Sequence, residues 1–233
     1  MKQYRVHLSE DSEYHTQRNN LVIPLTSCNT TSAIMFLKSS GIEFQCERDR
    51  FAGITQPEDY LTMMLRTDEA YKKMAELAPW AVGKFPPNEV HLVIAWGINQ
   101  LVGAEVAMFS VRHTIRTMLF GLLKGGAAIA SGVFAGFNHI VCVEGFSSAQ
   151  DLRNIRGAQE LDLEAVDGIW IDDPYGNPLM NYQSHKGNDI ELTFDEFDTM
   201  INTVNDPNRK WLHLLTPLGM EQVKPKPIKI IEI

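Results

Sequence analysis

The spacing of apolar residues changes near residue 126, and this change limits the possible folds more than any other feature of the chain. On the N-terminal side apolar residues recur about every 3.6 positions, which is typical of helices. On the C-terminal side short β-rich runs alternate with period two and are separated by Gly and Asn, as in an antiparallel sheet. The sequence therefore predicts an α+β fold in which helices come first and a sheet follows.

Caps, breakers and periodicity assign the individual segments. Helices are predicted over 26–41, 57–77, 111–126 with Ser110 as its cap, and 195–204. Strands are predicted over 127–134, 138–146, 168–173 and 189–194, with an extended tail over 224–233 at a sheet edge. The polar segment 147–167 is predicted to be a surface excursion. We expect one domain, 1–233, with a helical part over about 14–126 and a sheet part over about 127–233.

Charge and hydropathy exclude several classes of partner. The formal net charge is −8, and no run of Lys or Arg is long enough to follow a phosphate backbone. We therefore expect no nucleic acid and no membrane among the partners. The N-terminus lacks the apolar core of a secretory signal, and the longest apolar run, 125–137, is shorter than the about 20 residues that span a bilayer. These features predict a soluble, cytoplasmic protein, and they leave the oligomeric state undetermined.

The cysteines and histidines give no sign of a metal or disulfide scaffold. Cys28, Cys46 and Cys142 are odd in number and widely spaced, without a Cys-x-x-Cys pair. The histidines do not have the spacing of a zinc motif, and no glycine-rich loop is followed by Lys and Ser or Thr. At least one thiol must be free, and no cofactor or metal is expected.

Cys28 stands where a polar loop becomes an apolar helix. A thiol at the N-terminus of a helix lies at the positive end of the helix dipole, which favours the thiolate. The alternative is a packed structural thiol, because free cysteine is among the most buried residue types. A position on the loop side of the boundary favours the reactive interpretation.

A nucleophilic thiol needs a base, and the base needs a group that orients it. His139 opens the predicted strand 138–146, and the strand 168–173 ends in two carboxylates, Asp172 and Asp173. By strand parity Asp173 shares a face with Ile171, while Asp172 lies on the opposite face. If the isoleucine face is buried, Asp173 is the carboxylate that reaches the imidazole. Each residue also has an ordinary interpretation, as a core histidine or as turn residues before Pro.

Taken in order, these residues match a known arrangement. A Gln, a Cys at a helix start, a His at a strand start and an Asp at the end of the next strand follow the order of papain-like cysteine peptidases. More specifically, the chain resembles the C39-like peptidase family. The segments that resemble its patterns are 17–20 (QRNN), 27–35 (SCNTTSAIM), 127–131 (AAIAS), 138–146 (NHIVCVEGF), 170–178 (WIDDPYGNP) and 187–197 (GNDIELTFDEF).

The resemblance implies a role for each of four residues. It implies a papain-like fold with Cys28 as nucleophile, His139 as general base and then acid, and Asp173 as the residue that orients the imidazole. It also implies that the Gln17 side chain, with the backbone N–H of Cys28, donates hydrogen bonds to the oxyanion. A fixed donor of this kind contributes about 10²–10³ in rate.

Two features depart from the family pattern. Position 19 is Asn where the family usually has Asp, and the interval from His139 to Asp173 is long. Residues 42–109 match no known pattern. We expect residues 42–109 and the interval from His139 to Asp173 to flank the cleft, so that substrate specificity depends on them.

The sequence therefore predicts a thiol hydrolase that cleaves a peptide or isopeptide bond in a peptide or protein substrate. One alternative is a peptidoglycan-crosslink hydrolase of the same chemistry, which the net negative charge disfavours because wall polymers are largely anionic. Another is a binding or scaffold protein that keeps the fold without catalysis. The reactivity of Cys28 relative to Cys46 and Cys142 distinguishes an enzyme from a scaffold.

Overall fold

Eight antiparallel strands form one sheet in the computed structural model, which describes residues 2–47, 49–202, 209–223 and 225–233. The strands are β1 Tyr4–His7, β2 Ala107–His113, β3 Ala128–Phe134, β4 Phe137–Ser148, β5 Val166–Asp172, β6 Ile190–Thr193, β7 Lys210–Leu215 and β8 Ile231–Glu232. The helices are α1 Cys28–Ser39, α2 Pro57–Met64, α3 Asp68–Leu77, α4 His91–Val102, α5 Ile115–Leu122, α6 Phe194–Met200 and α7 Pro217–Val223. The predicted α+β class is confirmed.

The long strand β4 organises the sheet. One path runs β2-β7-β3-β4-β1-β8, while β5 pairs with β4 and carries β6 on its other side. The first half of β4 pairs with β3, where His139 lies opposite Gly132, and its second half pairs with β1 and β5. Because β5 runs antiparallel to β4, its end at Asp172 lies opposite Cys142, in the middle of β4 and three residues after His139. This register brings the end of β5 towards His139.

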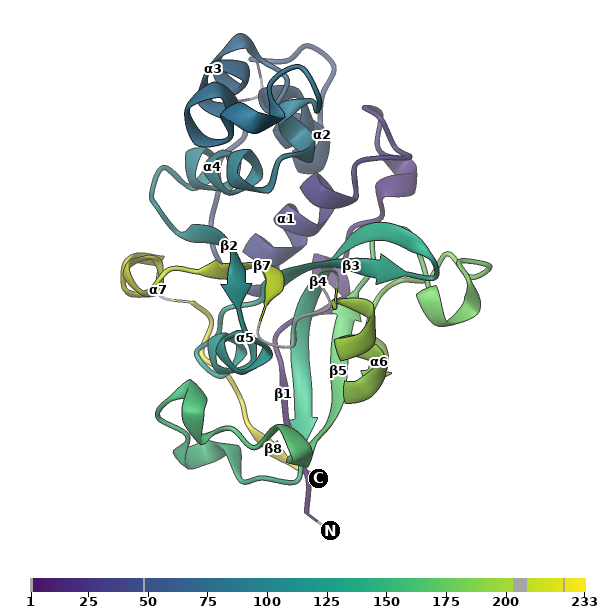
Figure 1. The fold of residues 1–233 in the computed structure, drawn as a ribbon, viewed down its shortest axis with the longest axis vertical. Coiled ribbons are helices and arrows are strands. Elements are labelled where there is room, and N and C mark those ends of the chain that lie inside the picture. The colour runs from purple at the N-terminus through teal and green to yellow at the C-terminus, as the bar shows by residue number, and fades with distance from the viewer. Residues whose placement is uncertain (1, 48, 203–208, 224) are drawn as a thin grey trace.

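Helix α1 packs against the sheet and forms the centre of the core. Its residues 33–37 (AIMFL) are all fully buried, as expected for a helix that is apolar on nearly every side. The Ser32 hydroxyl donates a 3.0 Å hydrogen bond to the Ile140 carbonyl, which fixes the helix against β4. In Figure 1, α1 lies between the strands and the group formed by α2, α3 and α4. Complete burial of a side chain such as Leu37 stabilises the fold by about 1.5–3 kcal/mol.

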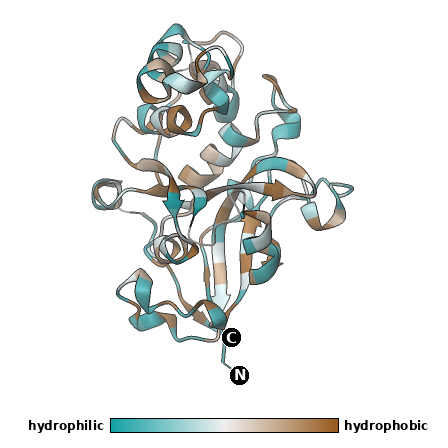
Figure 2. Ribbon diagram, viewed as in Figure 1, coloured by the Kyte–Doolittle hydropathy of each residue, from teal (hydrophilic) through white to brown (hydrophobic). Residues whose placement is uncertain are grey.

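The helical part is more interrupted than its sequence predicts. The expected helix over 57–77 is two helices, α2 and α3, which are separated at residues 65–67. Thr67 takes an extended conformation, and its side chain accepts a hydrogen bond from the Ala70 N–H, so it begins a new helix. Helix α4, which is not among the predicted helices, has a strongly apolar sequence and a largely brown ribbon in Figure 2.

The predicted helix over 111–126 with its cap at Ser110 is wrong in its first turn. Ser110 lies inside β2, which pairs with β7, and helix α5 begins only at Ile115. The cap is Thr114, whose side chain accepts from the Thr117 N–H in a capping box. The residues before Thr114 form a strand because β7, about 100 residues later, provides a partner that local sequence does not reveal.

The strands predicted after residue 126 are confirmed as β3, β4, β5 and β6, and helix α6 follows as expected. Residues 203–204 of the predicted helix 195–204, and residue 224 of the tail, lie outside the described residues. The tail ends in β8, which pairs with β1 at the edge of the sheet. The prediction that helices precede the sheet is only partly correct, because β1 and β2 come from the first half of the chain.

Within the described ranges, no helix has both the length and the hydrophobicity needed to cross a bilayer.

Candidate active site

Cys28 is the first residue of α1 and lines a cleft of about 1030 Å³. Asn20 fixes the loop before it, because its side-chain amide donates to the hydroxyls of Ser27 (2.8 Å) and Thr31 (3.0 Å). The first N–H groups of a helix have no intrahelical acceptor, so they can donate to a group bound beside the thiol. All three cysteines are free, and Cys28 is half-buried.

His139, the third residue of β4, faces the same cleft and is nearly buried, with 8% of its surface exposed. Its Nε2 lies 2.7 Å from Oδ1 of Asp173, so Nδ1 is the ring nitrogen left for a partner in the cleft. The rings of Phe134, Tyr175 and Tyr182 pack edge-on around the imidazole, with centroids 6.1, 6.3 and 5.8 Å away. These rings limit the access of water to the His139–Asp173 pair.

Asp173 follows β5 directly, is fully buried and accepts three hydrogen bonds. Oδ1 accepts from His139 and from the Tyr175 N–H (2.8 Å), and Oδ2 accepts from the Tyr182 hydroxyl (3.2 Å). A buried carboxylate is tolerated when donors surround it in this way. Asp173 is therefore held in one orientation towards the imidazole.

The charges of the site act strongly on His139. Burial by itself would lower the pKa of the imidazole, but the charge of Cys28 and the interactions with Asp173 raise this pKa to about 10. The imidazolium form is therefore favoured at neutral pH when the thiolate is its neighbour. Cys28, His139 and Asp173 can thus form a charged nucleophile, a proton donor and an orienting carboxylate.

Gln17 lies on the Cys28 side of the cleft, in a short 3₁₀ turn over Gln17–Asn19. The residue is 1% exposed, and its Nε2 donates 2.8 Å to the Pro24 carbonyl, which leaves the second N–H of this nitrogen for another acceptor. The Gln17 turn is tied to the turn after Asp173, because the Gln17 backbone N–H donates to the Pro174 carbonyl (3.0 Å). Arg18 strengthens the tie, since its Nε donates to the Tyr175 carbonyl (2.7 Å).

Asp172 points away from His139, although it is the residue before Asp173. It accepts from the Ser9 hydroxyl (3.2 Å) and from the Asp189 N–H (2.9 Å) on the opposite side of the strand. Burial and the nearby carboxylate of Glu144 raise the pKa of Asp172 to about 8. Burial, with the Asp189 carboxyl, likewise raises the pKa of Glu144 to about 8.

A second histidine, His91, also lines the cleft but has a different environment. Its Nδ1 lies 2.9 Å from Nε2 of His213, and its ring stacks on Phe109 with centroids 4.4 Å apart. Burial lowers the pKa of His91 to about 4, so this imidazole is neutral at physiological pH. Its contacts with His213 and Phe109 make it part of the cleft wall.

Large apolar side chains form much of the cleft wall. Trp80 (59% exposed) and Phe85 (46%) come from the segment before α4, while Leu25 (79%) and Phe137 (66%) flank the cysteine and the histidine. The prediction that 42–109 flanks the cleft is correct. The same prediction holds only for the start of the interval from His139 to Asp173, because His139 and Ile140 line the cleft and no residue of 147–167 does. Segment 147–167 follows the end of β4 opposite to His139.

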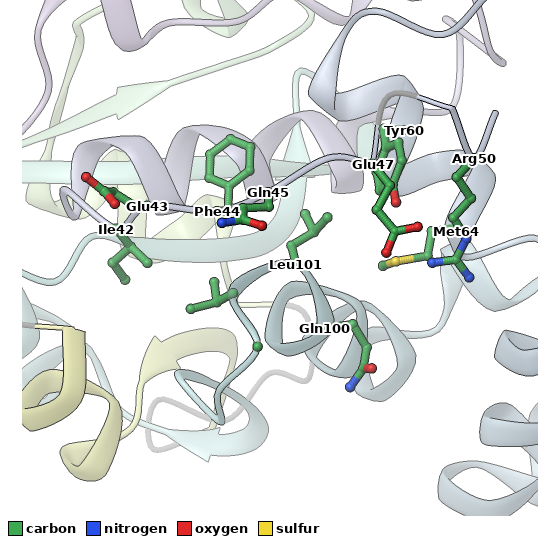
Figure 3. Close-up of a pocket in the computed structure, with 12 residues that line it drawn as sticks. Ile42, Glu43, Phe44, Gln45, Glu47, Arg50, Tyr60, Met64, Gln100 and Leu101 are labelled. Atoms are coloured by element: carbon green, nitrogen blue, oxygen red, sulfur yellow. The ribbon is translucent and has the colours of Figure 1, made fainter. Parts of the chain in front are cut away.

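A separate pocket of about 870 Å³ lies between residues 42–47, Arg50 and the ends of α2 and α4. Figure 3 shows Glu47 and Arg50 towards one end of this pocket and Glu43 towards the other. It shares no lining residue with the cleft around Cys28. None of the four residues with predicted catalytic roles lies there.

Sequence reasoning missed Tyr175 and Tyr182, the two tyrosines around Asp173. The sequence predicts a turn after Asp173, but nothing in it links Tyr175 to the imidazole that this ring covers. Tyr182 lies nine residues after Asp173 and carries no local signal. Only the turns after β5, which fold back on themselves, bring its hydroxyl to the carboxylate.

Comparison with solved structures supports the fold. No model of a known family matches the sequence, and no curated protein matches it either. A crystal structure described as a "putative C39-like peptidase" from Bacillus anthracis aligns with a TM-score of 0.50 and 13% sequence identity. The alignment covers 91% of this chain and 97% of that one. The two proteins thus share a fold.

Proposed function

We propose that this chain is a papain-like, C39-like cysteine peptidase that cleaves a peptide or isopeptide bond through an acyl-enzyme on Cys28. The observation that carries the proposal is the buried hydrogen bond between His139 and Asp173, with Cys28 in the same cleft at the start of α1. Helix α1 supplies the nucleophile and the sheet supplies the base and the carboxylate. We therefore propose that both parts of the chain form one catalytic domain.

The first half of the reaction forms a thioester. The Cys28 thiolate attacks the carbonyl carbon, a C–S bond forms, and the π electrons of the carbonyl move to its oxygen. Gln17 and the Cys28 backbone N–H donate hydrogen bonds to this oxyanion. When the oxyanion collapses, the C–N bond breaks and the Nδ1–H of the His139 imidazolium gives its proton to the leaving amine.

The second half releases the acid and regenerates the enzyme. Neutral His139 takes a proton from water through Nδ1, the resulting hydroxide attacks the thioester, and the C–S bond breaks to give back the thiolate. Throughout both halves Asp173 accepts the Nε2–H, which holds the ring with Nδ1 towards the cleft. The Tyr175 N–H and the Tyr182 hydroxyl keep Asp173 in place.

The cleft also favours one class of substrate. Its exposed wall residues, such as Trp80, Phe85 and Leu25, offer large apolar surfaces that a peptide with bulky apolar side chains would bury. A peptidoglycan crosslink carries sugars and carboxylates, which match neither this wall nor the net charge of −8. We therefore propose an extended or unfolded polypeptide as the substrate.

Selective alkylation tests the proposed nucleophile. Burial, together with the Glu58 carboxylate, raises the pKa of Cys46 to about 11, and burial raises that of Cys142 well above its usual range. Limiting iodoacetamide at pH 6 should therefore modify Cys28 first, as mapped by mass spectrometry. The rate should fall in His139→Ala. Equal rates at Cys28 and Cys46 would contradict the proposal.

Turnover of an unfolded protein substrate tests the reaction itself. Cys28→Ala should lower kcat/KM by about 10⁴ or more, while Cys46→Ala, a matched change at another half-buried thiol, should retain activity. Circular dichroism would show that both variants fold. A Cys28→Ala protein as active as Cys46→Ala would end this proposal.

A further inference from the structure

Three potential metal ligands from distant parts of the chain meet on the side of β5 away from the cleft. His7 is the last residue of β1, Glu144 lies in β4, and Asp189 immediately precedes β6. One ligand atom from each lies within 4.8 Å of the others. No sequence spacing reveals this group, because 137 positions separate His7 from Glu144.

The distances within the group suit a common central ion. His7 Nε2 lies 3.2 Å from Oε1 of Glu144 and 2.8 Å from Oδ1 of Asp189, so one nitrogen faces both carboxylates. Two ligands at about 2.0–2.2 Å from a tetrahedral zinc ion are about 3.3 Å apart. The His7–Glu144 separation is close to this value, and a small outward shift of the Asp189 side chain would bring the His7–Asp189 separation to it.

Glu144 adds a second, independent observation. Its side chain is fully buried, yet Oε2 has no hydrogen-bond partner among the described residues. A buried carboxylate oxygen without a donor is costly, and such an atom needs a cation, a proton or water. Among the ion pairs of the described residues, none joins a Lys or Arg to Glu144, Asp172 or Asp189.

We propose that His7, Glu144 and Asp189 bind a divalent transition-metal ion of the Zn²⁺ or Mn²⁺ type, separate from the catalytic cleft. One imidazole and two carboxylates suit these ions better than Ca²⁺, which prefers oxygen ligands throughout. The two carboxylates balance the charge of the ion, and the His7 imidazole completes three protein ligands, with water in the remaining position. His7 and Asp189 are 29% and 36% exposed, which gives the ion a path from solvent.

Bound metal would fasten three segments that support the active site. The Asp189 N–H donates to Asp172, and two residues earlier the Gly187 carbonyl accepts from the Asp173 N–H (2.8 Å). The loop 187–189 therefore connects the proposed metal ligands with the backbone of the catalytic carboxylate. The ion acts as a structural clamp between β1, β4 and this loop, and the inference does not depend on peptidase activity.

Isothermal titration calorimetry on metal-free protein tests the site. Cys28→Ala is the right background, because it removes the thiol that would otherwise bind Zn²⁺ beside His139. One equivalent of Zn²⁺ or Mn²⁺ should bind, and Asp189→Asn and His7→Gln should each weaken the affinity at least about tenfold. Asn suits position 189, where φ is +53° and Asn is tolerated. Asp195→Asn, at an exposed carboxylate, is the matched control and should leave affinity unchanged.

A thermal shift provides the second readout, since a ligand that binds only the folded state raises Tm. The shift with Zn²⁺ should appear in the Cys28→Ala background and in its Asp195→Asn form, and should shrink in its Asp189→Asn form. The proposal is wrong if neither metal binds saturably below about 1 mM. It is also wrong if both ligand variants bind as tightly as the control, or if Ca²⁺ binds more tightly than Zn²⁺.

Discussion

Asp172 and Asp173 are neighbours in the chain and are both fully buried, yet their surroundings differ completely. Asp173 faces an imidazole, a backbone N–H and a phenol hydroxyl, all of which donate to it. Asp172 faces the side of the sheet that holds Glu144, and burial with this neighbouring carboxylate raises its pKa to about 8. Burial alone therefore does not decide what a carboxylate can do, because the groups that share its pocket decide it.

The largest expected effect comes from exchanging each aspartate for its amide. Asp173→Asn should lower kcat/KM by up to about 10⁴, because an amide does not stabilise the imidazolium and can favour the wrong tautomer. Asp172→Asn should leave kcat/KM close to the wild-type value. Steady-state kinetics on one peptide substrate measures both, and equal losses would contradict the distinction between the two sides of the strand.

Gln17 provides a finer test of the proposed catalytic group on the cleft side of β5. Gln17→Ala should lower kcat by about 10²–10³ with little change in KM, because its amide stabilises charge that develops in the transition state. Gln100→Ala changes an exposed glutamine in the separate pocket and should have wild-type kinetics. A Gln17→Ala variant that raises KM alone would assign Gln17 to substrate binding.

The pH dependence of stability tests the charge of His139. Its pKa is raised from 6.5 to about 10 on folding, so the folded state binds the proton more tightly than the unfolded state. The stabilisation is complete below pH 6.5 and is lost as pH rises through 10, by about 2–5 kcal/mol. Urea unfolding between pH 6 and 10 should show this fall in wild type. In His139→Gln the fall in unfolding free energy over this pH range should be much smaller. An equal fall in the two proteins would contradict a charged His139 in the folded state.

Gly187 tests the contact between the loop 187–189 and the backbone of Asp173. A Cβ at this position would lie 1.9 Å from the Asp173 carbonyl oxygen, so Gly187→Ala must displace the backbone. We expect a loss of about 1–3 kcal/mol in unfolding free energy and reduced kcat. Gly121→Ala, inside helix α5 with only an ordinary contact at 3.8 Å, should instead stabilise by up to about 1 kcal/mol. Chemical denaturation of the two variants checks the opposite signs.

The smallest expected effect is at Tyr182. Tyr182→Phe removes one of three donors to Asp173 but keeps the ring against His139. We expect kcat to fall about tenfold or less, since the other two donors remain. Tyr71→Phe, at an exposed tyrosine, should not change kcat. An effect as large as that of Asp173→Asn would mean that the hydroxyl itself takes part in the reaction.

The sequence by itself determined the features that depend on near neighbours. The start of α1 near Cys28 follows from a polar loop that meets an apolar run, and β3, β4 and β5 follow from period-two patterns between turns. Parity along the predicted strand 168–173 placed Asp172 and Asp173 on opposite faces, which is how they lie. The roles of Gln17 and His139 came from the order of motifs along the chain, and they stay predictions.

Tertiary structure decided everything that depends on a distant partner. Ser110 lies in a strand only because β7 pairs with it, and segment 147–167 lies far from the cleft because β4 is long enough to carry it away. His7 and Glu144 meet through the pairing of β1 with β4. The physical reason is general: periodicity tells which face of a segment is buried, but not which other segment will cover that face.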